Sequence, residues 1–308
     1  MFFAEKSIGA ELYQGGCSFL LASGKQETPV IERFGTVAFP GDAMRLSIKE
    51  ANILDRQELV PLVTDAWKSL DSEIKRISVS IPDLSGRIVI VEMDSIPKHH
   101  EEGIDQIKWK LKKNFPLDLN DMHLDYQLLS ADGKGGGRAL AAVISIDVVR
   151  DYEELFCEAG LEPVKIDFAT FNLIRLFLNR LDIQEDPVFI SLYRGNLTVM
   201  GFQENLLDFH RSKAVAATPL DPARLFREVN SSLLVYSDSR GGVKPQRIFY
   251  YAAPNDRGVL RRVLFESLGV EPVLMDTDNF ISTARQQLDR NLLPELLSAL
   301  GAASRGLS

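Results

Sequence analysis

The sequence predicts a two-lobed α/β fold that carries a smaller α+β segment inserted into its first lobe. A β-β-β-α-β-α order of apolar segments occurs twice, in residues 7–81 plus 163–182 and again in residues 187–276. Residues 84–162, which interrupt the first copy, follow a different β-α-β-β-α order. At 308 residues the chain is also long for one hydrophobic core, which favours two lobes or more.

The first copy opens with a predicted hairpin. Two apolar runs are joined by Gln14-Gly15-Gly16, and consecutive glycines permit the positive φ angles of a tight turn. A helix follows where the apolar residues recur at helical spacing. The predicted elements are strands over Ser7–Tyr13, Cys17–Ala22, Pro29–Phe39, Ile77–Ile81 and Pro163–Phe168, and helices over Arg56–Leu70 and Ala169–Leu181.

The inserted segment and the second copy are read in the same way. In the insert, strands are predicted over Arg87–Met93, His123–Leu129 and Arg138–Ile146, and helices over Lys98–Phe115 and Val148–Ala159. In the second copy, strands are predicted over Val188–Tyr193, Leu197–Phe202, Leu206–His210, Gln246–Tyr251 and Glu271–Met275, and helices over Asp221–Val235 and Arg257–Leu268. A last helix is predicted over Phe280–Leu300.

Two such halves facing one cleft are the plan of the actin and sugar-kinase superfamily. On that plan we expect a first lobe from residues 1–83 plus 163–185, an inserted subdomain from 84–162 and a second lobe from 186–277. A C-terminal helix or tail would occupy 278–308. Only about one helix fits into 212–245, so the wall that a second-lobe subdomain normally adds there is expected to be reduced.

Composition and charge exclude several classes of protein. The formal net charge of −8 disfavours binding to nucleic acid. The two cysteines, Cys17 and Cys157, lack the spacing of a zinc site or a disulfide framework, and no metal site is expected. The N-terminus does not read as a signal peptide, and no apolar run approaches the ~18 residues that span a bilayer. We therefore expect an intracellular protein without direct membrane insertion.

Four stretches resemble the PilM family of type IV pilus assembly proteins. They are a strand ending in Ile-Pro at Ile77–Asp83, a helix end at Trp109–Leu119 that contains Asn114-Phe115-Pro116-Leu117, the strand Leu124–Gln127, and the stretch Ala159–Asp167. The resemblance covers residues 77–180 in order and spacing, with thinner similarity on both sides. It implies an actin-like, ribonuclease H-like fold whose inserted subdomain is placed as in FtsA.

The resemblance also implies a partner and a cofactor. The family binds the N-terminal tail of PilN, a membrane protein, and so sits at the inner face of the inner membrane within the pilus assembly complex. For this chain, candidate contacts with such a peptide are the apolar residues Ile96, Pro97, Trp109, Phe115 and Tyr126. The family also binds ATP in the cleft.

The residues expected at that nucleotide site depart from the family's pattern. Residual positions are Glu11, Gly15 and Gly16 in the first hairpin and Ser191 and Gly195 in the second. Glu11 stands where the family has Asp, and the second hairpin has no acid.

Bulky or donor-free residues also occupy the three turns that should meet the nucleotide. Tyr13 and Tyr193 add bulk where phosphate should lie, and Pro254 brings no N–H to the turn that should support adenosine. We therefore expect a pseudo-ATPase scaffold with no catalytic residues and no cofactor.

Two alternatives stay open. One is an active switch that binds Mg-ATP through Glu11, Gly15 and Gly16 and changes its affinity for a partner. The other is a relative from a secretion system or from cell division with the same fold. A division relative carries a C-terminal amphipathic anchor, and the tail Asp278–Leu300 is too interrupted by Gln, Arg and Asp to form one.

Overall fold

The computed structural model describes residues 5–41, 43–112, 118–131, 135–181, 186–215, 220–277, 281–283 and 292–307. The chain forms two compact units. The first comprises Met1–Ser85, Val148–Arg180 and Asp276–Ser308, and the second comprises Gly86–Asp147 and Leu181–Met275. Each unit is built around its own β-sheets.

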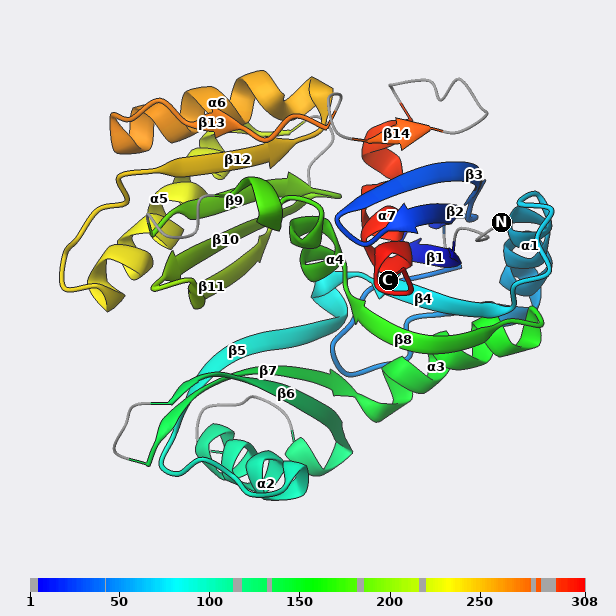
Figure 1. Ribbon diagram of the computed structural model, residues 1–308, viewed down its shortest axis with the longest axis horizontal. Helices are drawn as coiled ribbons and strands as arrows, with labels where there is room; N and C mark the ends of the chain where they lie inside the picture. Colours follow the sequence, from blue (N-terminus) through cyan, green and yellow to red (C-terminus); the bar gives the residue numbers. More distant parts are fainter. Residues whose placement is uncertain are drawn as a thin grey trace. The chain divides into compact units, whose positions relative to one another are not determined.

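The first unit contains a six-stranded sheet in the order β14-β3-β2-β1-β4-β8 (Figure 1). Strands β1, β2 and β3 are antiparallel, whereas β4 runs parallel to β1 and β8 runs parallel to β4. The strands are β1 Lys6–Tyr13, β2 Gly16–Lys25, β3 Thr28–Ala38, β4 Arg76–Ile81, β8 Glu162–Phe168 and β14 Ser282–Thr283.

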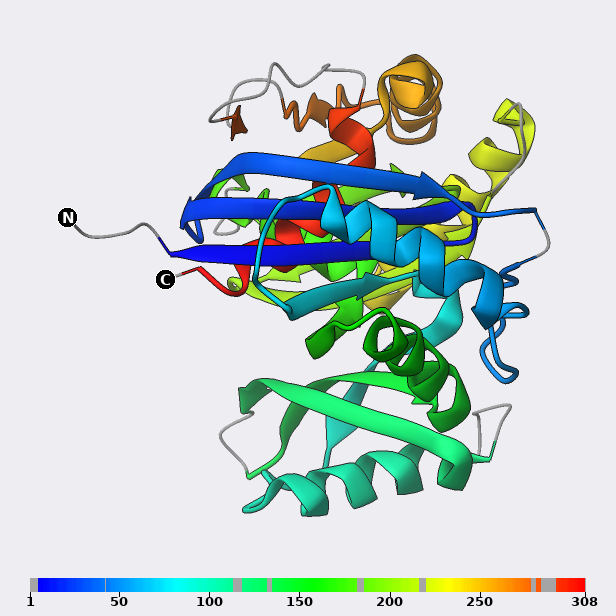
Figure 2. The same cartoon turned by 90° about the vertical axis from the view of Figure 1, so that its right-hand side faces the viewer.

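Helices cover both faces of this sheet, which is why β1 and β2 are buried along most of their length. On one face, Gly35 of β3 lies against the backbone of Ala66 in α1 (Arg56–Lys68), and Phe156 of α3 (Ile146–Glu158) packs on Phe19. On the other face, Gly9 of β1 lies against α7 (Leu297–Ser304). Figure 2 shows α1 lying along its face of the sheet.

Helix α3 differs from expectation, because it belongs to the first unit and not to the inserted subdomain predicted over 84–162. Its Asp151 and Tyr152 are buried and hydrogen-bond to the loop that contains Asn52. The helix predicted over Ala169–Leu181 also ends earlier, as α4 Ala169–Arg175, and a short 3₁₀ turn over Leu178–Arg180 follows it.

The C-terminal segment is not the single helix predicted over Phe280–Leu300. Ser282–Thr283 forms β14, which pairs in parallel with Val30 and Ile31 of β3. A 3₁₀ turn over Leu293–Glu295 leads into α7, all of whose residues are buried. The C-terminal helix is therefore a core element of the first lobe, and not a peripheral tail.

The second unit repeats the strand order of the first. Its five-stranded sheet runs β11-β10-β9-β12-β13, with β9, β10 and β11 antiparallel and β12 and β13 added in parallel. The elements are β9 Val188–Tyr193, β10 Asn196–Gln203, β11 Leu206–Ala214, α5 Pro222–Ser239, β12 Ile248–Ala252, α6 Pro254–Leu268 and β13 Val273–Leu274. Helices α5 and α6 share one core cluster on this sheet, built from residues such as Leu225, Val229 and Leu260.

The inserted part of the second unit is a three-stranded antiparallel sheet in the order β5-β7-β6, covered by one helix. Its elements are β5 Gly86–Met93, α2 His100–Leu111, β6 Met122–Ala131 and β7 Gly137–Ser145. Figure 2 shows α2 lying across the sheet. Ile107 of α2 is fully buried and packs with Val91, Leu124 and Val143, which form the core of this subdomain.

Candidate nucleotide-binding turns and partner surface

The first predicted turn is closed by its own residues. Strands β1 and β2 pair up to Tyr13 and Gly16, and the carbonyl of Gly15 accepts a hydrogen bond from the amide of Phe39 at 3.0 Å. A Cβ at Gly16 would lie 2.1 Å from the carbonyl oxygen of Val37, so glycine is needed there for packing alone. The Tyr13 ring folds over the same turn, where its Oη would lie 2.9 Å from that Cβ.

Glu11 lies in a buried polar region of the first lobe. Glu11 is 1% exposed, and the sheet register places it beside Ser18 of β2 and Ser80 of β4. The Ser80 hydroxyl lies 2.5 Å from the hydroxyl of Ser298 on α7. Glu11 thus sits among hydroxyl groups, which is a suitable setting for a buried carboxyl group.

Two further polar groups of the first lobe keep unused hydrogen-bonding capacity. Ser18 Oγ and both amide atoms of Asn172 are buried and make no hydrogen bond within the part of the chain that the structure describes. Asn172 lies on α4 and its backbone carbonyl touches Gly301 of α7. These atoms could accept a water molecule or a polar ligand.

The second predicted turn joins β9 and β10 through Arg194 and Gly195, which both have positive φ angles of 50° and 73°. This is a tight turn of the type that matches the twist of a hairpin. Tyr193 is buried and its ring lies 6.4 Å from that of Tyr251, while the Arg194 guanidinium stands 5.7 Å from the Tyr193 ring centre. Ser191 is also buried and pairs with Thr198 in the sheet.

The third predicted turn connects β12 to α6. Pro254 occupies the start of the helix, so it offers no backbone N–H at this position. The amides of Asp256 and Arg257 both donate to the carbonyl of Ala253, and Arg257 Nε donates to the carbonyl of Ala252 at 3.2 Å. This helix start is therefore covered by an arginine side chain.

The three turns are poorly suited to bind Mg-ATP. A phosphate cradle needs glycine amides that a ligand can approach, and Tyr13 lies over the glycines of the first turn. Among the described residues, His, Cys, Asp and Glu form no group of three that could hold a metal ion, but Mg²⁺ bound through nucleotide phosphates and water needs no such group.

The residues predicted to bind a partner peptide do not form one surface. Trp109 is 68% exposed on the side of α2 opposite its buried Ile107, with Lys110 Nζ 5.9 Å from its ring centre. Tyr126 instead lies beneath α2, where its hydroxyl end meets Gly103 and its ring stacks on His100 at 4.7 Å. Trp109 and Tyr126 are therefore separated by the helix itself.

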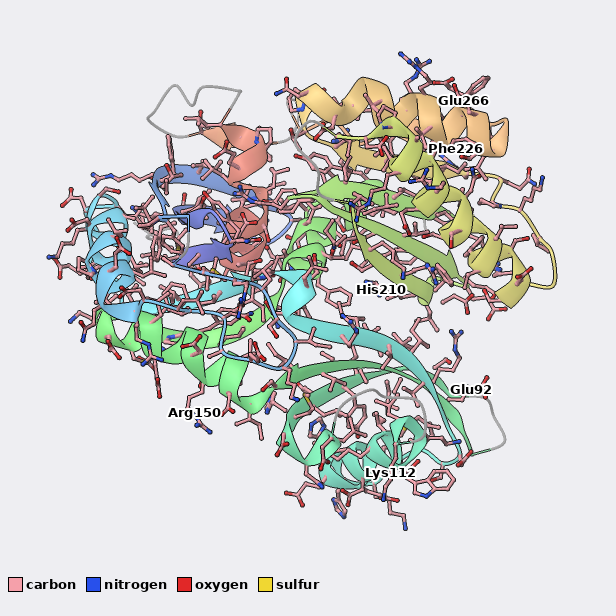
Figure 3. The ribbon with its side chains drawn as sticks, turned by 180° about the vertical axis from the view of Figure 1, so that it is seen from behind. Glu92, Lys112, Arg150, His210, Phe226 and Glu266 are labelled. Atoms are coloured by element: carbon pink, nitrogen blue, oxygen red, sulfur yellow. The ribbon has the colours of Figure 1, made fainter. Side chains whose placement is uncertain are left out.

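The loop before α2 carries the other candidates. Ile96 is partly exposed, and its amide donates to the carbonyl of Gly135 at 2.8 Å, while Pro97 is half-buried. Phe115 lies outside the described residues. Figure 3 labels Lys112, which lies at the end of α2 near Trp109. Ile96 and Trp109 are thus the predicted residues that expose apolar surface in the inserted subdomain.

Two polar clusters in the structure have no counterpart among the residues predicted from the sequence. In the first unit the carboxylate of Asp151 accepts hydrogen bonds from the amides of Asn52 and Ile53 and from Arg56. In the second unit Asp208 of β11 meets Arg138 of β7 and Arg240 at the end of α5. The partners lie 32 to 99 residues apart in the sequence, so no local spacing could have indicated them.

Comparison with known proteins supports the fold. No family model and no curated protein match the sequence. A solved PilM–PilN type IV pilus biogenesis complex contains a chain of the same fold, with a TM-score of 0.81, 16% identity and 98% of each chain covered.

Two further solved structures have lower similarity. One is a Bacteroides thetaiotaomicron protein with an actin-like ATPase fold and unknown function, with a TM-score of 0.55, 12% identity, and 88% of this chain and 91% of that chain covered. The other is the cytoplasmic domain of EpsL, an inner-membrane component of the Vibrio cholerae type II secretion system, with a TM-score of 0.54, 11% identity, and 96% and 94% covered. The predicted actin-like fold is thereby confirmed. Within the described residues, no helix combines the length and apolarity that crossing a membrane requires.

Proposed function

We propose that this chain is a scaffold of a type IV pilus-type assembly machine, which binds the N-terminal tail of a PilN-like inner-membrane protein. The observation that carries the proposal is the full-length similarity to a chain of the PilM–PilN complex, at a TM-score of 0.81. The retained inserted subdomain supports it, because this part of the chain carries the family-like stretches around Trp109 and Leu124–Gln127. The protein would act in the cytoplasm, at the inner face of the membrane.

The geometry divides the candidate contact residues into two groups. Ile96 and Trp109 expose apolar atoms that a peptide could cover, whereas Tyr126 supports α2 from within. We therefore assign peptide contact to Ile96 and Trp109. Tyr126 is assigned a structural role in holding the helix.

Calorimetric titration with the tail peptide of a PilN-like protein tests this assignment. Trp109→Ala should weaken binding on the order of tenfold or more, because exposed aromatic anchors contribute most at interfaces. Leu234→Ala, which removes a similarly exposed side chain (64%) from α5, is the matched control and should bind as the wild type does. If the wild type, Trp109→Ala and Leu234→Ala all bound the peptide with equal affinity, the assignment of the peptide site to the surface around Trp109 would be wrong.

We further propose that nucleotide binding has been lost. Support comes from Tyr13 over the first turn, from Tyr193 packed in the second and from Pro254 at the start of α6. Titration with magnesium-ATP, followed by thermal unfolding, is the test. A ligand present at a hundred times its dissociation constant adds about 2.7 kcal/mol to the unfolding free energy, so the absence of a shift at millimolar nucleotide would support the loss.

One observation favours an alternative, an ATP-dependent switch of the same machine. Glu11 is buried beside Ser18, whose hydroxyl has no partner within the described residues, and such a pair could orient a ligand's magnesium-bound water. Saturable, magnesium-dependent binding that Glu11→Ala abolishes would establish the switch and overturn the pseudo-ATPase.

A further inference from the structure

A β-bulge in the second unit directs one carboxylate out of its sheet. Gly201 of β10 pairs with Phe209 of β11, but the next residue, Phe202, pairs with Leu207. Asp208 therefore has no residue opposite it in the ladder. Bulges of this kind change the direction in which a side chain points. Here the bulge presents Asp208, whose side chain is 14% exposed, to two arginines.

The two arginines come from different parts of the second unit. Arg138 is the second residue of β7 in the inserted sheet. Its guanidinium contacts the Asp208 carboxylate through Nη1 and the Asp208 backbone carbonyl at 2.7 Å through Nη2. Arg240, at the end of α5 in the second lobe, reaches the other carboxylate oxygen at 3.2 Å. Asp208 thus joins the inserted sheet to the second lobe.

The second-lobe side of this cluster is held in place by the core. Arg240 is 12% exposed, with its guanidinium 5.6 Å from the Tyr236 ring centre and 3.5 Å from Asp186. Tyr236 in turn packs edge-on against Phe209 at 5.3 Å and fills the space beside Gly201, where a Cβ would lie 2.4 Å from the ring. The site that receives Arg138 is therefore preorganised by packed side chains.

The connectivity of the chain gives this cluster its significance. The inserted subdomain is joined by peptide bonds at both of its ends to residues of the first unit, Ser85 and Val148. Its contacts nevertheless group it with the second lobe, where β11 runs near β5 and β6. The two halves of the second unit are thus held together without a direct peptide link, and the ion pair between Arg138 and Asp208 is one of the contacts that join them.

We propose that Arg138, Asp208 and Arg240 form a latch that makes the inserted subdomain follow the second lobe, although its covalent connections lead to the first. A buried or half-buried charge network of this type favours one arrangement strongly when all members are paired. Under the proposed function, in which a partner peptide binds the inserted subdomain, the latch transmits that binding event to α5 and β11.

Hydrogen exchange of the full chain tests the latch without any ligand. Arg138→Gln should raise the exchange rates of amides in β5, β7 and β11 on the order of tenfold, which corresponds to about 1.4 kcal/mol, because it removes the charged contact with Asp208. Arg138→Lys keeps the positive charge but cannot make both contacts with Asp208. Its amide exchange rates should therefore lie between those of the wild type and those of Arg138→Gln. The matched control is Arg261→Gln, which breaks an exposed ion pair with Glu271 (2.6 Å) in the same lobe and should exchange as the wild type does. Wild-type exchange in Arg138→Gln would overturn the latch.

Adding the PilN-like tail peptide separates this inference from the proposed function. In the wild type, peptide binding should slow exchange in the inserted subdomain and also in β11 and the end of α5. In Arg138→Gln the slowing should be confined to the inserted subdomain. If the peptide does not bind the wild type, the proposed function fails, and the ligand-free comparison still decides whether the latch exists. If binding protects β11 equally in both proteins, the latch does not transmit it.

Discussion

The carboxylate of Asp151 holds a loop of the first lobe onto α3. It accepts hydrogen bonds from the amides of Asn52 (3.0 Å) and Ile53 (2.7 Å) and from Arg56 Nη2 (2.8 Å), and its side chain is 6% exposed. Removing it leaves two buried amides and a guanidinium without this acceptor. We expect Asp151→Ala to lower the free energy of unfolding by about 3 kcal/mol, as measured by urea denaturation.

Asp94→Ala provides the matched control for this prediction. Asp94 pairs with Lys110 at 2.6 Å, but its side chain is 75% exposed. Surface pairs of this kind contribute less than about 1 kcal/mol. Equal losses in the two variants would show that the Asp151 network adds nothing beyond an ordinary surface contact.

His210 makes stability depend on pH. It lies on β11, where Figure 3 labels it, and burial lowers its pKa to about 4. The unfolded chain binds a proton near the ordinary pKa of about 6.5, so stability is full above pH 6.5 and falls as the pH drops towards 4. At pH 5 this one group should cost up to about 2 kcal/mol.

Denaturant unfolding at pH 7.5 and pH 5 checks this in the wild type and in His210→Gln. Glutamine cannot take up the proton, so the variant should lose less stability between the two pH values, although other groups titrate in both proteins. The same pH dependence in both proteins would show that the His210 imidazole titrates normally in the fold.

Among the helices and strands, α7 packs closely against both α4 and β1 because glycines lie at the two contacts. A Cβ at Gly301 would lie 1.8 Å from the carbonyl oxygen of Asn172 in α4, and a Cβ at Gly9 would lie 1.9 Å from that of Ala299. Gly301→Ala should therefore destabilise the protein by about 2 kcal/mol, even though alanine favours a helix by about 1 kcal/mol. Gly258→Ala on α6 is the control. A Cβ at Gly258 would have none of the neighbouring atoms within 4 Å, so this substitution should stabilise the protein. Thermal unfolding of the two variants should shift in opposite directions.

Elements with local signals were predicted well from the sequence. Both predicted hairpins form, and the second turn has positive φ angles at Arg194 and Gly195. In the first hairpin neither Gly15 nor Gly16 has the positive φ angle that was predicted for it; Gly16 is needed because a Cβ there would meet the carbonyl oxygen of Val37. The C-terminal helix was misplaced because α7 is buried all round, so its small residues show no amphipathic period. A strand of two residues such as β14 carries too little pattern to be recognised.

For the molecule as a whole, the alternation of strands and helices predicted an α/β protein, and the doubled β-β-β opening together with the resemblance to the PilM family narrowed this to the actin-like class. In both sheets two strands are added in parallel beside the first strand of an antiparallel β-β-β unit, and in the first sheet β14 is also added in parallel beside β3. Hydrophobic patterning recovers the order of these strands along the chain, apart from β14. Contacts between distant residues could not be recovered in this way. The meeting of Arg138 with Asp208 depends on a bulge in β11, and a bulge changes the alternation of a strand by one residue without indicating which distant residue its side chain meets.

Vesicle binding distinguishes a scaffold that is tethered to the membrane by a partner from a protein that binds lipid itself. With a net charge of −8 the chain should be repelled by anionic vesicles, so flotation of the purified protein with bare vesicles should recover little of it. Vesicles that display a PilN-like N-terminal tail should recover most of it, and Trp109→Ala should reduce that recovery. Equal recovery on bare anionic vesicles would contradict the tether. It would instead assign the exposed indole of Trp109 and the neighbouring Lys108 and Lys112 to contact with the lipid surface, because tryptophan and lysine are typical of such interfaces.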